Sequence, residues 1–435
     1  MPNKSIYNSY VQRDAAVIWH PFTQHQIEPF SIPITKGEGC WLYGENEEKY
    51  LDAISSWWVN IHGHGHPYMA QKIYEQALKI EQVIFAGFTH EPAITLSERL
   101  LAHLPNHFQK VFFSDNGSTA VEVGVKMALQ YFHNQGNTQK RKILALQDAY
   151  HGDTFGAMSL GAPSSFNAPF QDMLFEVEFI SQPNNPEACI QDMKSRLASA
   201  PDEYAAFIFE PLVQGAGGML MYEASTLDAL IQLAHEHGLL CIADEIMTGF
   251  GRTGKWFAMD YLHEKPDIVC LSKGLTGGMM AMGVTCCSNE LFDSFLSNDR
   301  KKTLFHSHSF TANPLACAAA NASLDLMEKE ETWINIERIM LTHQQWAESQ
   351  KNHPILQNIR QQGTILALDL QVGEATGYMH PLRDIAYQYF IKKGILLRPL
   401  GNTLYILAPY CIKNEELTLI YQALEAFAEE LRITY

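Results

Sequence analysis

The chain has 435 residues, of which 46% are apolar and 18% are charged, an ordinary balance for a globular protein. Its 48 acidic and 31 basic residues give a net charge of −17, and no run rich in lysine or arginine offsets it locally. Nucleic acid and anionic membranes are therefore disfavoured as partners, which leaves small molecules and other protein chains.

The sequence also predicts a cytoplasmic protein. Residues 1–22 contain no apolar core of a secretory signal, and no apolar run approaches the length of a membrane span. The eight cysteines form no C-x-x-C pair, which favours reduced and mostly buried thiols.

Residues 1–60 mix extended segments with turns, and we expect them to join a smaller domain. They run into "SSWWVNIHGHGHP", residues 55–67, in which three histidines occupy alternate positions: His62, His64 and His66. Alternate residues share one face of a strand, so a metal site, a strand with one wet face and a pocket wall are all open. The two glycines between the histidines argue against metal, because they loosen the backbone where ligands need rigidity.

Short apolar runs alternate with helical stretches in the middle of the chain, from about residue 117 to residue 320. Such nearly continuous apolar runs predict a mostly parallel sheet covered by helices on both faces. We expect a large α/β domain over residues 61–328, with ligands beyond the carboxyl ends of its strands. The polar residues that follow these runs should converge on one crevice: Asp115, Asn116, Tyr150, Glu210, Asp244 and Lys273.

The remaining residues, 329–435, predict a smaller α+β domain packed on the large one. A long helix comes first, followed by short extended runs that begin at Thr364, Ile395 and Thr403. A closing helix is expected from Asn414 onward.

Gly117 and Ser118, in "SDNGSTAVE", lie at a predicted helix start. Free backbone N–H groups and the helix dipole favour an anion there, most often a phosphate. An ordinary helix cap with a turn glycine would explain the same residues, so the pair alone is weak evidence.

Asp244 and Lys273 each follow an apolar strand and precede a glycine-rich loop. A buried carboxylate needs a cationic partner or several donors. A lysine desolvated at a strand end has a lowered pKa, which imine chemistry requires. A structural ion pair between the two is the alternative, but they stand on different strands, and the flexible loops suit a bound ligand.

An anion site, an aromatic residue, a buried carboxylate and a strand-end lysine together suggest the cofactor pyridoxal phosphate. Lys273 would bond to it as an imine, and Asp244 would keep the pyridine nitrogen protonated, so that the ring accepts electrons. Tyr150 would stack on the ring. The helix start would hold the phosphate.

Three blocks resemble the signatures of the class III aminotransferases, the ornithine- and GABA-type family: "FEPLVQGAGGM", "ADEIMTGFGRTGK" and "LSKGLTGG". Further blocks resemble the members that aminate 8-amino-7-oxononanoate in biotin biosynthesis: "IWHPFTQ", "SSWWVNIHGHGHP", "VKMALQYF", "YHGDTFGAMS" and "NPLACAAANASL". The resemblance runs from about residue 12 to residue 430. It implies a fold-type I transferase that binds pyridoxal phosphate and forms a homodimer.

The resemblance also assigns roles around the cofactor. Lys273 matches the catalytic lysine that carries the cofactor, and Asp244 matches the partner of the pyridine nitrogen. Gly117 and Ser118 match the phosphate-binding pair, and Tyr150 matches the tyrosine beside ring and substrate.

In "HSHSFTANP", residues 306–309 match a His-Gly-Pro-Thr block that reaches the site from the neighbouring subunit in this family. Ser307 replaces the glycine, His308 the proline and Ser309 the threonine. Ser309 keeps a hydroxyl for the phosphate, and His308 stands beside it in the cofactor set. Ser307 is expected to contact the substrate. The kind of contact is not specified, because the loop departs from the family pattern at this residue.

Arg398, in "LLRPLGN", matches the arginine that takes the substrate carboxylate, a natural bidentate role. Trp57 and Phe22 are expected to line the substrate channel, whereas Trp58 is expected to be plain core. The histidines beside them are not expected to bind a metal. Three other residues of the signature blocks are expected to brace the loops around the cofactor: Glu210, Gln214 and Arg252.

The expected reaction converts 8-amino-7-oxononanoate to 7,8-diaminononanoate in two half-reactions through one site. S-adenosylmethionine is the expected donor, because His20 and Trp57 resemble the members that use it, although Phe22 stands where those members have tyrosine. The alternatives are the same step with lysine as donor, another class III ω-amine aminotransferase, and a non-enzymatic binding protein.

Overall fold

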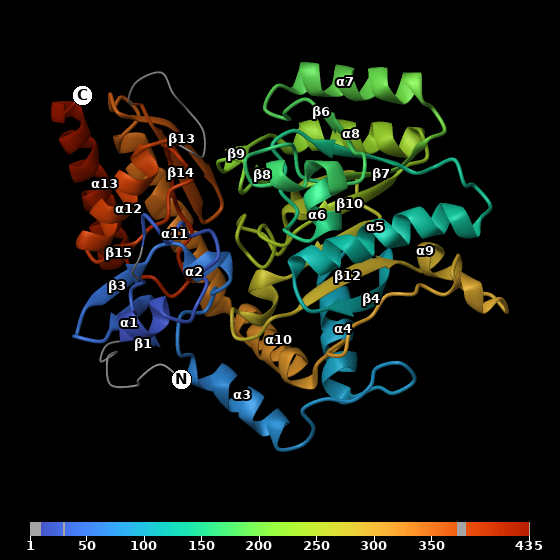
Figure 1. Cartoon of the computed structure of the whole chain (residues 1–435), viewed down its shortest axis with the longest axis horizontal. Helices are drawn as coiled ribbons and strands as arrows, with labels where there is room; N and C mark the ends of the chain where they lie inside the picture. Colours follow the sequence, from blue (N-terminus) through green and yellow to red (C-terminus); the bar gives the residue numbers. More distant parts are fainter. Residues whose placement is uncertain (1–9, 29–30, 372–379, 435) are drawn as a thin grey trace.

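The computed structural model describes residues 10–28, 31–371 and 380–434 (Figure 1). Residues 1–9, 29–30, 372–379 and 435 lie outside the described part. They belong to the predicted regions 1–60 and 329–435, which the structure therefore describes only in part. The helices are α1 (Tyr10–Ala15), α2 (Ser55–Trp58), α3 (Pro67–Ala77), α4 (Glu91–His103), α5 (Gly117–Asn134), α6 (Phe155–Ser159), α7 (Pro186–Ser199), α8 (Ala224–Glu236), α9 (Asn289–Asp293), α10 (Pro314–Met327), α11 (Glu330–Ser349), α12 (Leu382–Lys392) and α13 (Asn414–Thr434). The strands are β1 (Ile34–Glu38), β2 (Trp41–Gly44), β3 (Lys49–Asp52), β4 (Phe108–Ser114), β5 (Lys142–Leu146), β6 (Glu178–Ile180), β7 (Tyr204–Phe209), β8 (Val213–Gln214), β9 (Leu220–Met221), β10 (Leu240–Asp244), β11 (Ile268–Leu271), β12 (Gly283–Ser288), β13 (Leu356–Gln362), β14 (Ile365–Leu370), β15 (Ile395–Leu396) and β16 (Thr403–Ile406).

A seven-stranded sheet lies at the centre of the large part of the molecule, in the order β4-β12-β11-β10-β7-β5-β6. The strands from β11 to β6 pair in parallel. β12 runs antiparallel to both of its neighbours, β11 and β4. The mostly parallel sheet that the sequence predicts is confirmed, with one reversed strand.

Alternate side chains of this sheet enter two separate cores, one on each face. In β10, Cys241 and Ala243 join the core that includes α8, whereas Ile242 joins the core that includes α5. Figure 1 shows these two helices on opposite sides of the strands. Burial on both faces explains why the strands are unbroken apolar runs, and it confirms the predicted α/β class.

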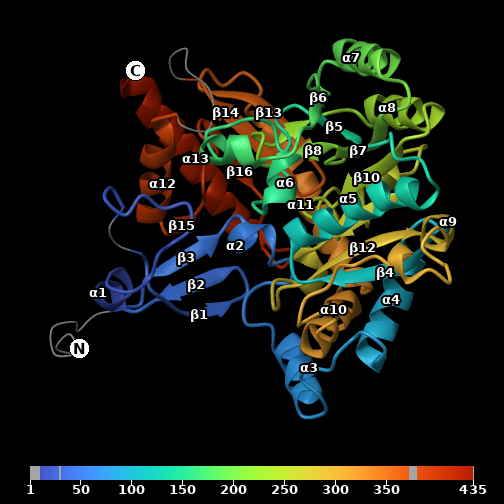
Figure 2. The same ribbon diagram turned by 45° about the vertical axis from the view of Figure 1, so that its right-hand side comes forward.

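The two ends of the chain share a second sheet. β1, β2 and β3 are antiparallel neighbours, and β3 pairs in parallel with β15. Beside it, β13, β14 and β16 form an antiparallel sheet, with α11 packed on β13. Figures 1 and 2 both show the blue N-terminal strands next to the orange and red C-terminal elements. The domain boundaries 1–60, 61–328 and 329–435 stay predictions.

Candidate active site

A cavity of about 360 Å³ lies beyond the carboxyl ends of the parallel strands. The six polar residues that the sequence places after these strands all line it: Asp115, Asn116, Tyr150, Glu210, Asp244 and Lys273. Gly117 and Ser118 line it as well. The predicted convergence is therefore confirmed, and it follows from parallel strands that all end at the same edge of a sheet.

The start of α5 presents free backbone donors to this cavity. Asn116 caps the helix by accepting the Thr119 N–H at 2.9 Å, and the Thr119 hydroxyl accepts the Asn116 N–H in return. The N–H groups of Gly117 and Ser118 have no protein acceptor in the described part of the chain. Both observations fit an anion site, because a capped helix with unused N–H groups attracts negative charge.

Gly152 packs so tightly against Ser118 that no other residue fits. A Cβ at Gly152 would lie 2.0 Å from the Ser118 Oγ, and the φ angle of Gly152 is +136°. The same hydroxyl accepts the Asp153 N–H at 3.2 Å. The "YHGD" turn therefore fixes the Ser118 side chain at the edge of the cavity.

Lys273 follows β11 directly and extends into the cavity. Its Nζ lies 4.7 Å from the centre of the Trp58 ring. Burial lowers the pKa of Lys273, while the carboxylates of Asp244 and Glu210 act in the opposite direction. The direction of this shift is the one predicted from the sequence, and it increases the share of the neutral, nucleophilic amine at neutral pH.

The prediction of plain core for Trp58 is incomplete. Trp58 is only 5% exposed, and its Nε1 donates to the Tyr405 hydroxyl at 2.9 Å. Its ring nevertheless lines the cavity and faces Lys273. A residue can therefore be almost fully buried and still form part of the cavity wall.

Asp244 pairs with a residue that sequence reasoning missed. His151 Nδ1 lies 2.7 Å from Asp244 Oδ2, with the His151 side chain fully buried. The backbone N–H of Ile246 donates to the other carboxylate oxygen at 3.1 Å. The alternative of an Asp244–Lys273 ion pair is wrong for this conformation, since the carboxylate bonds to His151. The sequence signal that could have identified His151 is its position in the "YHGD" block, directly after Tyr150.

Glu210 holds two loops of the cavity wall together. Its carboxylate accepts the N–H groups of Tyr150 at 3.0 Å and Gly215 at 2.9 Å. Burial raises the pKa of Glu210 to about 7, although nearby His151 and the two N–H groups oppose this rise. These contacts fit the predicted bracing role. Burial and the Asp153 carboxylate also raise the pKa of Tyr150 well above its usual range, so its hydroxyl stays protonated.

Phe22, Trp57 and Arg398 gather at a separate place, outside the lining of this cavity. The rings of Phe22 and Trp57 are 5.3 Å apart, and the Arg398 guanidinium lies 5.1 Å from the Trp57 ring centre. Trp57 is 43% exposed, in contrast to Trp58. No carboxylate of the described residues pairs with Arg398, so its guanidinium is available to a ligand.

Two further hollows connect this aromatic cluster with the cavity. The first, of about 690 Å³, shares Tyr150 and Gly152 with the cavity at one end and contains Phe166 at the other. Phe166 and Phe22 both line the second hollow, and their ring centres are 6.0 Å apart. A long ligand could therefore extend from Lys273 toward Phe22 and Trp57.

Residues 306–309 do not line the cavity of their own chain. The hydroxyl of Ser307 bonds to that of Thr311 at 3.0 Å, and the Ser309 carbonyl accepts the Gln82 side chain at 2.9 Å. His308 is partly buried, and Ser309 is exposed. Their cofactor and substrate contacts therefore stay predictions, because this chain alone does not place them at its cavity.

The three alternating histidines point to different partners. His64 Nε2 lies 2.9 Å from Asp52 Oδ2, and His62 Nε2 lies 2.9 Å from the Ser323 hydroxyl. His66 packs its ring edge against His62. These separate contacts disfavour a shared metal-binding face, and the expectation that the three histidines bind no metal stays a prediction.

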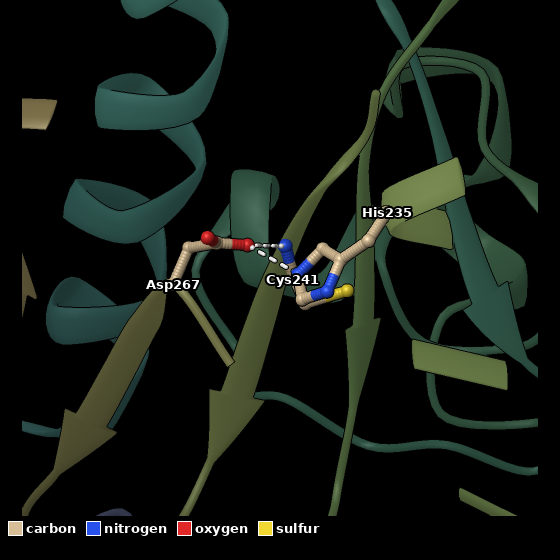
Figure 3. Close-up of side chains that lie close together, drawn as sticks. All are labelled: His235, Cys241 and Asp267. Atoms are coloured by element: carbon tan, nitrogen blue, oxygen red, sulfur yellow. Dashed lines mark hydrogen bonds and ion pairs between the residues drawn. The ribbon is translucent and has the colours of Figure 1, made fainter. Parts of the chain in front are cut away.

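Another group of possible metal ligands lies near the amino ends of β10 and β11, at His235, Cys241 and Asp267. Figure 3 shows the Asp267 carboxylate facing both the Cys241 N–H, at 2.7 Å, and the His235 ring, at 3.1 Å. The hydrogen bond to Asp267 raises the pKa of His235, so a proton competes with any metal for this ring. Hydrogen bonding explains the group, and the expectation of no bound metal stays a prediction.

Among the described helices, none combines the length and the apolarity that a membrane crossing requires.

Comparison with known proteins gives consistent matches along the chain. The "Aminotransferase class-III" family model matches residues 22–428. An adenosylmethionine-8-amino-7-oxononanoate aminotransferase from Synechococcus elongatus is 46% identical over 424 residues, which cover 95% of this chain and 99% of the relative.

Solved structures agree. The crystal structure of an enzyme of that name from Methanocaldococcus jannaschii has a TM-score of 0.92 at 33% identity, covering 96% of this chain and 98% of the other. An amine transaminase from an uncultivated Pseudomonas species, solved in its PLP-bound form, has a TM-score of 0.89 at 28% identity, covering 95% and 98%.

Proposed function

Because this chain belongs to the class III aminotransferases, we propose that it transfers an amino group to 8-amino-7-oxononanoate in biotin biosynthesis, giving 7,8-diaminononanoate. The observation that carries this substrate is the 46% identity, over 95% of the chain, to a relative named for that reaction. A coupled assay of the purified protein with 8-amino-7-oxononanoate, adding one candidate donor at a time, tests it. Failure with every donor would contradict the proposal.

The enzyme uses pyridoxal phosphate, and the residues around the cavity fit that group. Unused N–H groups at the start of α5 suit its phosphate, together with the Ser118 hydroxyl. Asp244, held by His151, suits the protonated pyridine nitrogen. When bound, the cofactor supplies an aldehyde that exchanges amino groups and a ring that withdraws electrons from the reacting carbon.

Lys273 is proposed to act twice. Its lowered pKa makes the neutral amine available as a nucleophile that holds the cofactor. Once a donor amine has displaced it, the same Nζ would accept a proton from the donor's reacting carbon and return it two bonds away, to the carbon on the other side of the transferred nitrogen. The Trp58 ring, 4.7 Å from Nζ, limits where this amine can move.

The remote end of the acceptor is proposed to lie near Arg398. The acceptor is a long apolar chain with a terminal carboxylate, which requires an apolar wall and one cation. Trp57 and Phe22 offer such a wall, and Arg398 lies directly over Trp57. Ser307 of a second chain belongs to this set only if the subunits assemble as proposed below.

Two alternatives from the same family share this cofactor site. A different ω-amine aminotransferase is disfavoured by the identity to relatives named for the biotin step. Lysine as donor in the same step differs only in the first half-reaction. A non-enzymatic binding protein is disfavoured by the family match over residues 22–428 and by the lowered pKa of Lys273.

S-adenosylmethionine is the proposed donor, and it should convert the cofactor faster than lysine at equal concentration. The exposed Trp57 ring can stack on adenine, which contributes about 1–3 kcal/mol by analogy with base–aromatic stacking. Lysine offers no such ring. The missing hydroxyl at Phe22 costs only about 0.5–1.5 kcal/mol if a water replaces it. Single-turnover absorbance, recorded with each donor in turn, measures the difference.

Two variants separate these contributions. Trp57→Ala should slow the reaction with S-adenosylmethionine by about 5- to 150-fold, the equivalent of the lost stacking. Phe22→Tyr serves as the matched control in the same aromatic cluster and should change the rate much less. Faster conversion by lysine in the wild-type enzyme would overturn the assignment and make Phe22 the better indicator of the donor.

We also propose a homodimer in which residues 306–309 complete the neighbour's cavity. Two segments of the chain, residues 81–88 and residues 305–313, support this proposal. The side chains of Gln82 and Asn313 hydrogen-bond the two segments to each other. This joined surface exposes four large apolar side chains: Ile84, Phe88, Phe305 and Phe310. An apolar surface of this kind beside a loop that its own cavity does not use fits burial against a second copy.

Mixed dimers provide the test. Ser309→Asp should weaken cofactor binding through repulsion of the phosphate, and Lys273→Ala should remove the catalytic amine. If Ser309 acts across the interface, mixing and refolding the two inactive proteins should regenerate about a quarter of the wild-type sites. No recovery in mixed dimers verified by mass spectrometry, or a fully active monomer in sedimentation, would contradict the proposal.

The cytoplasm is the proposed compartment, on the ground that all eight cysteines are free in the folded chain.

A further inference from the structure

Cys40 and Cys411 lie side by side, although 371 residues separate them in the sequence. Their sulfur atoms are 3.5 Å apart. Cys40 directly precedes β2 and is buried, whereas Cys411 lies between β16 and α13 and is exposed. The other six cysteines are buried, and no second pair of sulfurs among the described residues lies within hydrogen-bonding distance.

We propose that Cys40 and Cys411 are a redox-active thiol pair, which small-molecule disulfides oxidise to an intramolecular disulfide bond. A disulfide has its sulfurs about 2.05 Å apart, so the pair must close by roughly 1.5 Å to form one. This inference does not depend on the substrate of the enzyme.

The two thiols differ in reactivity in the way that such a pair requires. The contact with Cys40 lowers the pKa of the Cys411 thiol, and the Arg338 guanidinium acts in the same direction against burial and Glu416. The same interaction and burial raise the pKa of Cys40 far above its usual range. Because Cys411 is the exposed residue of the pair and Cys40 is buried, Cys411 is assigned as the attacking thiol and Cys40 as the resolving thiol.

The space around Cys411 is created by a glycine. Gly63 has a φ angle of +88°, and a Cβ built on it would lie 2.6 Å from the Cys411 Sγ. A side chain at this position would therefore push the sulfur aside. Gly63 belongs to the histidine-rich stretch of residues 55–67. Its role there is to leave room for the Cys411 sulfur.

The reaction balances with glutathione disulfide as the oxidant. The Cys411 thiolate attacks one glutathione sulfur, forms a mixed disulfide and releases one glutathione thiolate, which takes up a proton. The Cys40 thiol then gives its proton to the second departing glutathione while its sulfur bonds to the Cys411 sulfur. The pair loses two electrons and two protons in total, and glutathione disulfide becomes two thiols.

The bond would tie together two supports of the tryptophan turn, which is the turn over residues 54–58 that carries Trp57 and Trp58. The Cys40 carbonyl accepts the Asp52 N–H at 2.7 Å, and the Asp52 carboxylate accepts the N–H groups of Ile54 and Ser56. On the other side, Tyr410 donates to the Ile61 carbonyl at 2.9 Å. The cross-link would join the segments that precede and follow Trp57 and Trp58.

The test equilibrates the cofactor-loaded, full-length enzyme with glutathione buffers of increasing oxidised fraction. Remaining thiols are then alkylated, and the peptides are identified by mass spectrometry. The expected result is a Cys40–Cys411 linked peptide, an intact mass lower by two hydrogens and the loss of two alkylatable thiols. Cys40→Ser should instead accumulate the glutathione mixed disulfide on Cys411.

Cys317→Ser is the matched control, since Cys317 is buried without a neighbouring thiol, and this variant should keep the cross-link. Wild-type protein that carries glutathione on Cys411 while Cys40 remains alkylatable would overturn the proposal. So would protein in which Cys411 stays reduced throughout the series. The wild-type peptide map alone decides between these outcomes, so the proposal stays testable if a serine variant fails to fold.

Discussion

Replacing Lys273 with alanine is expected to lower kcat by about 10⁴-fold or more, since a positioned acid–base group contributes up to roughly that factor. The variant also loses the amine that holds the cofactor, while the start of α5 and Asp244 remain. Steady-state assays with 8-amino-7-oxononanoate measure the loss. Borohydride treatment of the wild-type enzyme should attach the cofactor covalently to the peptide that contains Lys273.

Lys140→Ala is the matched control for this experiment. Burial also lowers the pKa of Lys140, but its Nζ bonds to the carbonyls of His237 and Gly238, away from the cavity. This variant should retain kcat even if it unfolds at a lower temperature. Full transamination by a colourless, correctly folded Lys273→Ala enzyme would refute the assigned role.

Arg398→Ala is expected to weaken both the donor and the acceptor by about 2–5 kcal/mol, the usual cost of truncating one partner of a buried charge pair. That equals roughly a 30- to 5,000-fold rise in each KM. One site must accept two different carboxylates in turn, and the Arg398 guanidinium has no carboxylate partner among the described residues. Separate half-reaction titrations give the two values.

Arg398→Lys and Arg196→Ala complete this series. The lysine keeps the charge but loses the bidentate fork, so it should recover only part of the affinity. Arg196 is paired with Asp192 and Glu178 on the surface, and its loss should leave both KM values unchanged. If Arg398→Ala affects only one of the two acids, they are anchored differently, and the single-anchor model is wrong.

The central sheet and the cavity at its edge could be predicted because their signals are local. Each strand of the central sheet is an unbroken apolar run, and the polar residue at its end marks the ligand side. Asp244 and Lys273 are visible in this way without any knowledge of the fold. The antiparallel direction of β12 could not be predicted, because an apolar run in a sequence does not show which way the strand runs in the sheet.

Other features depend on contacts that leave no local trace. The pairing of His151 with Asp244 spans 93 residues, and the stacking of Arg398 over Trp57 joins opposite ends of the chain. β13, "LQNIRQQ", is largely polar because much of it is only partly buried, so no apolar pattern announces it. The sequence predicts that Trp58 is buried, but it does not show whether a buried tryptophan lies in the packed core or in the wall of a cavity.

The tryptophan turn has a consequence for the order in which the chain folds. Ser55, Ser56 and Trp58 have φ angles of 52°, 60° and 69°, which non-glycine residues rarely adopt unaided. Asp52 supports this turn locally, but two further supports come from the far end of the chain: the Ser55 hydroxyl donates to the Leu407 carbonyl, and Trp58 donates to Tyr405, 352 and 347 residues away. A nascent chain still attached to the ribosome before residue 405 therefore contains Lys273, Asp244 and α5 but cannot hold this wall in place. Completion of the cavity, and with it tight capture of a cofactor, must wait until synthesis of the chain is almost finished.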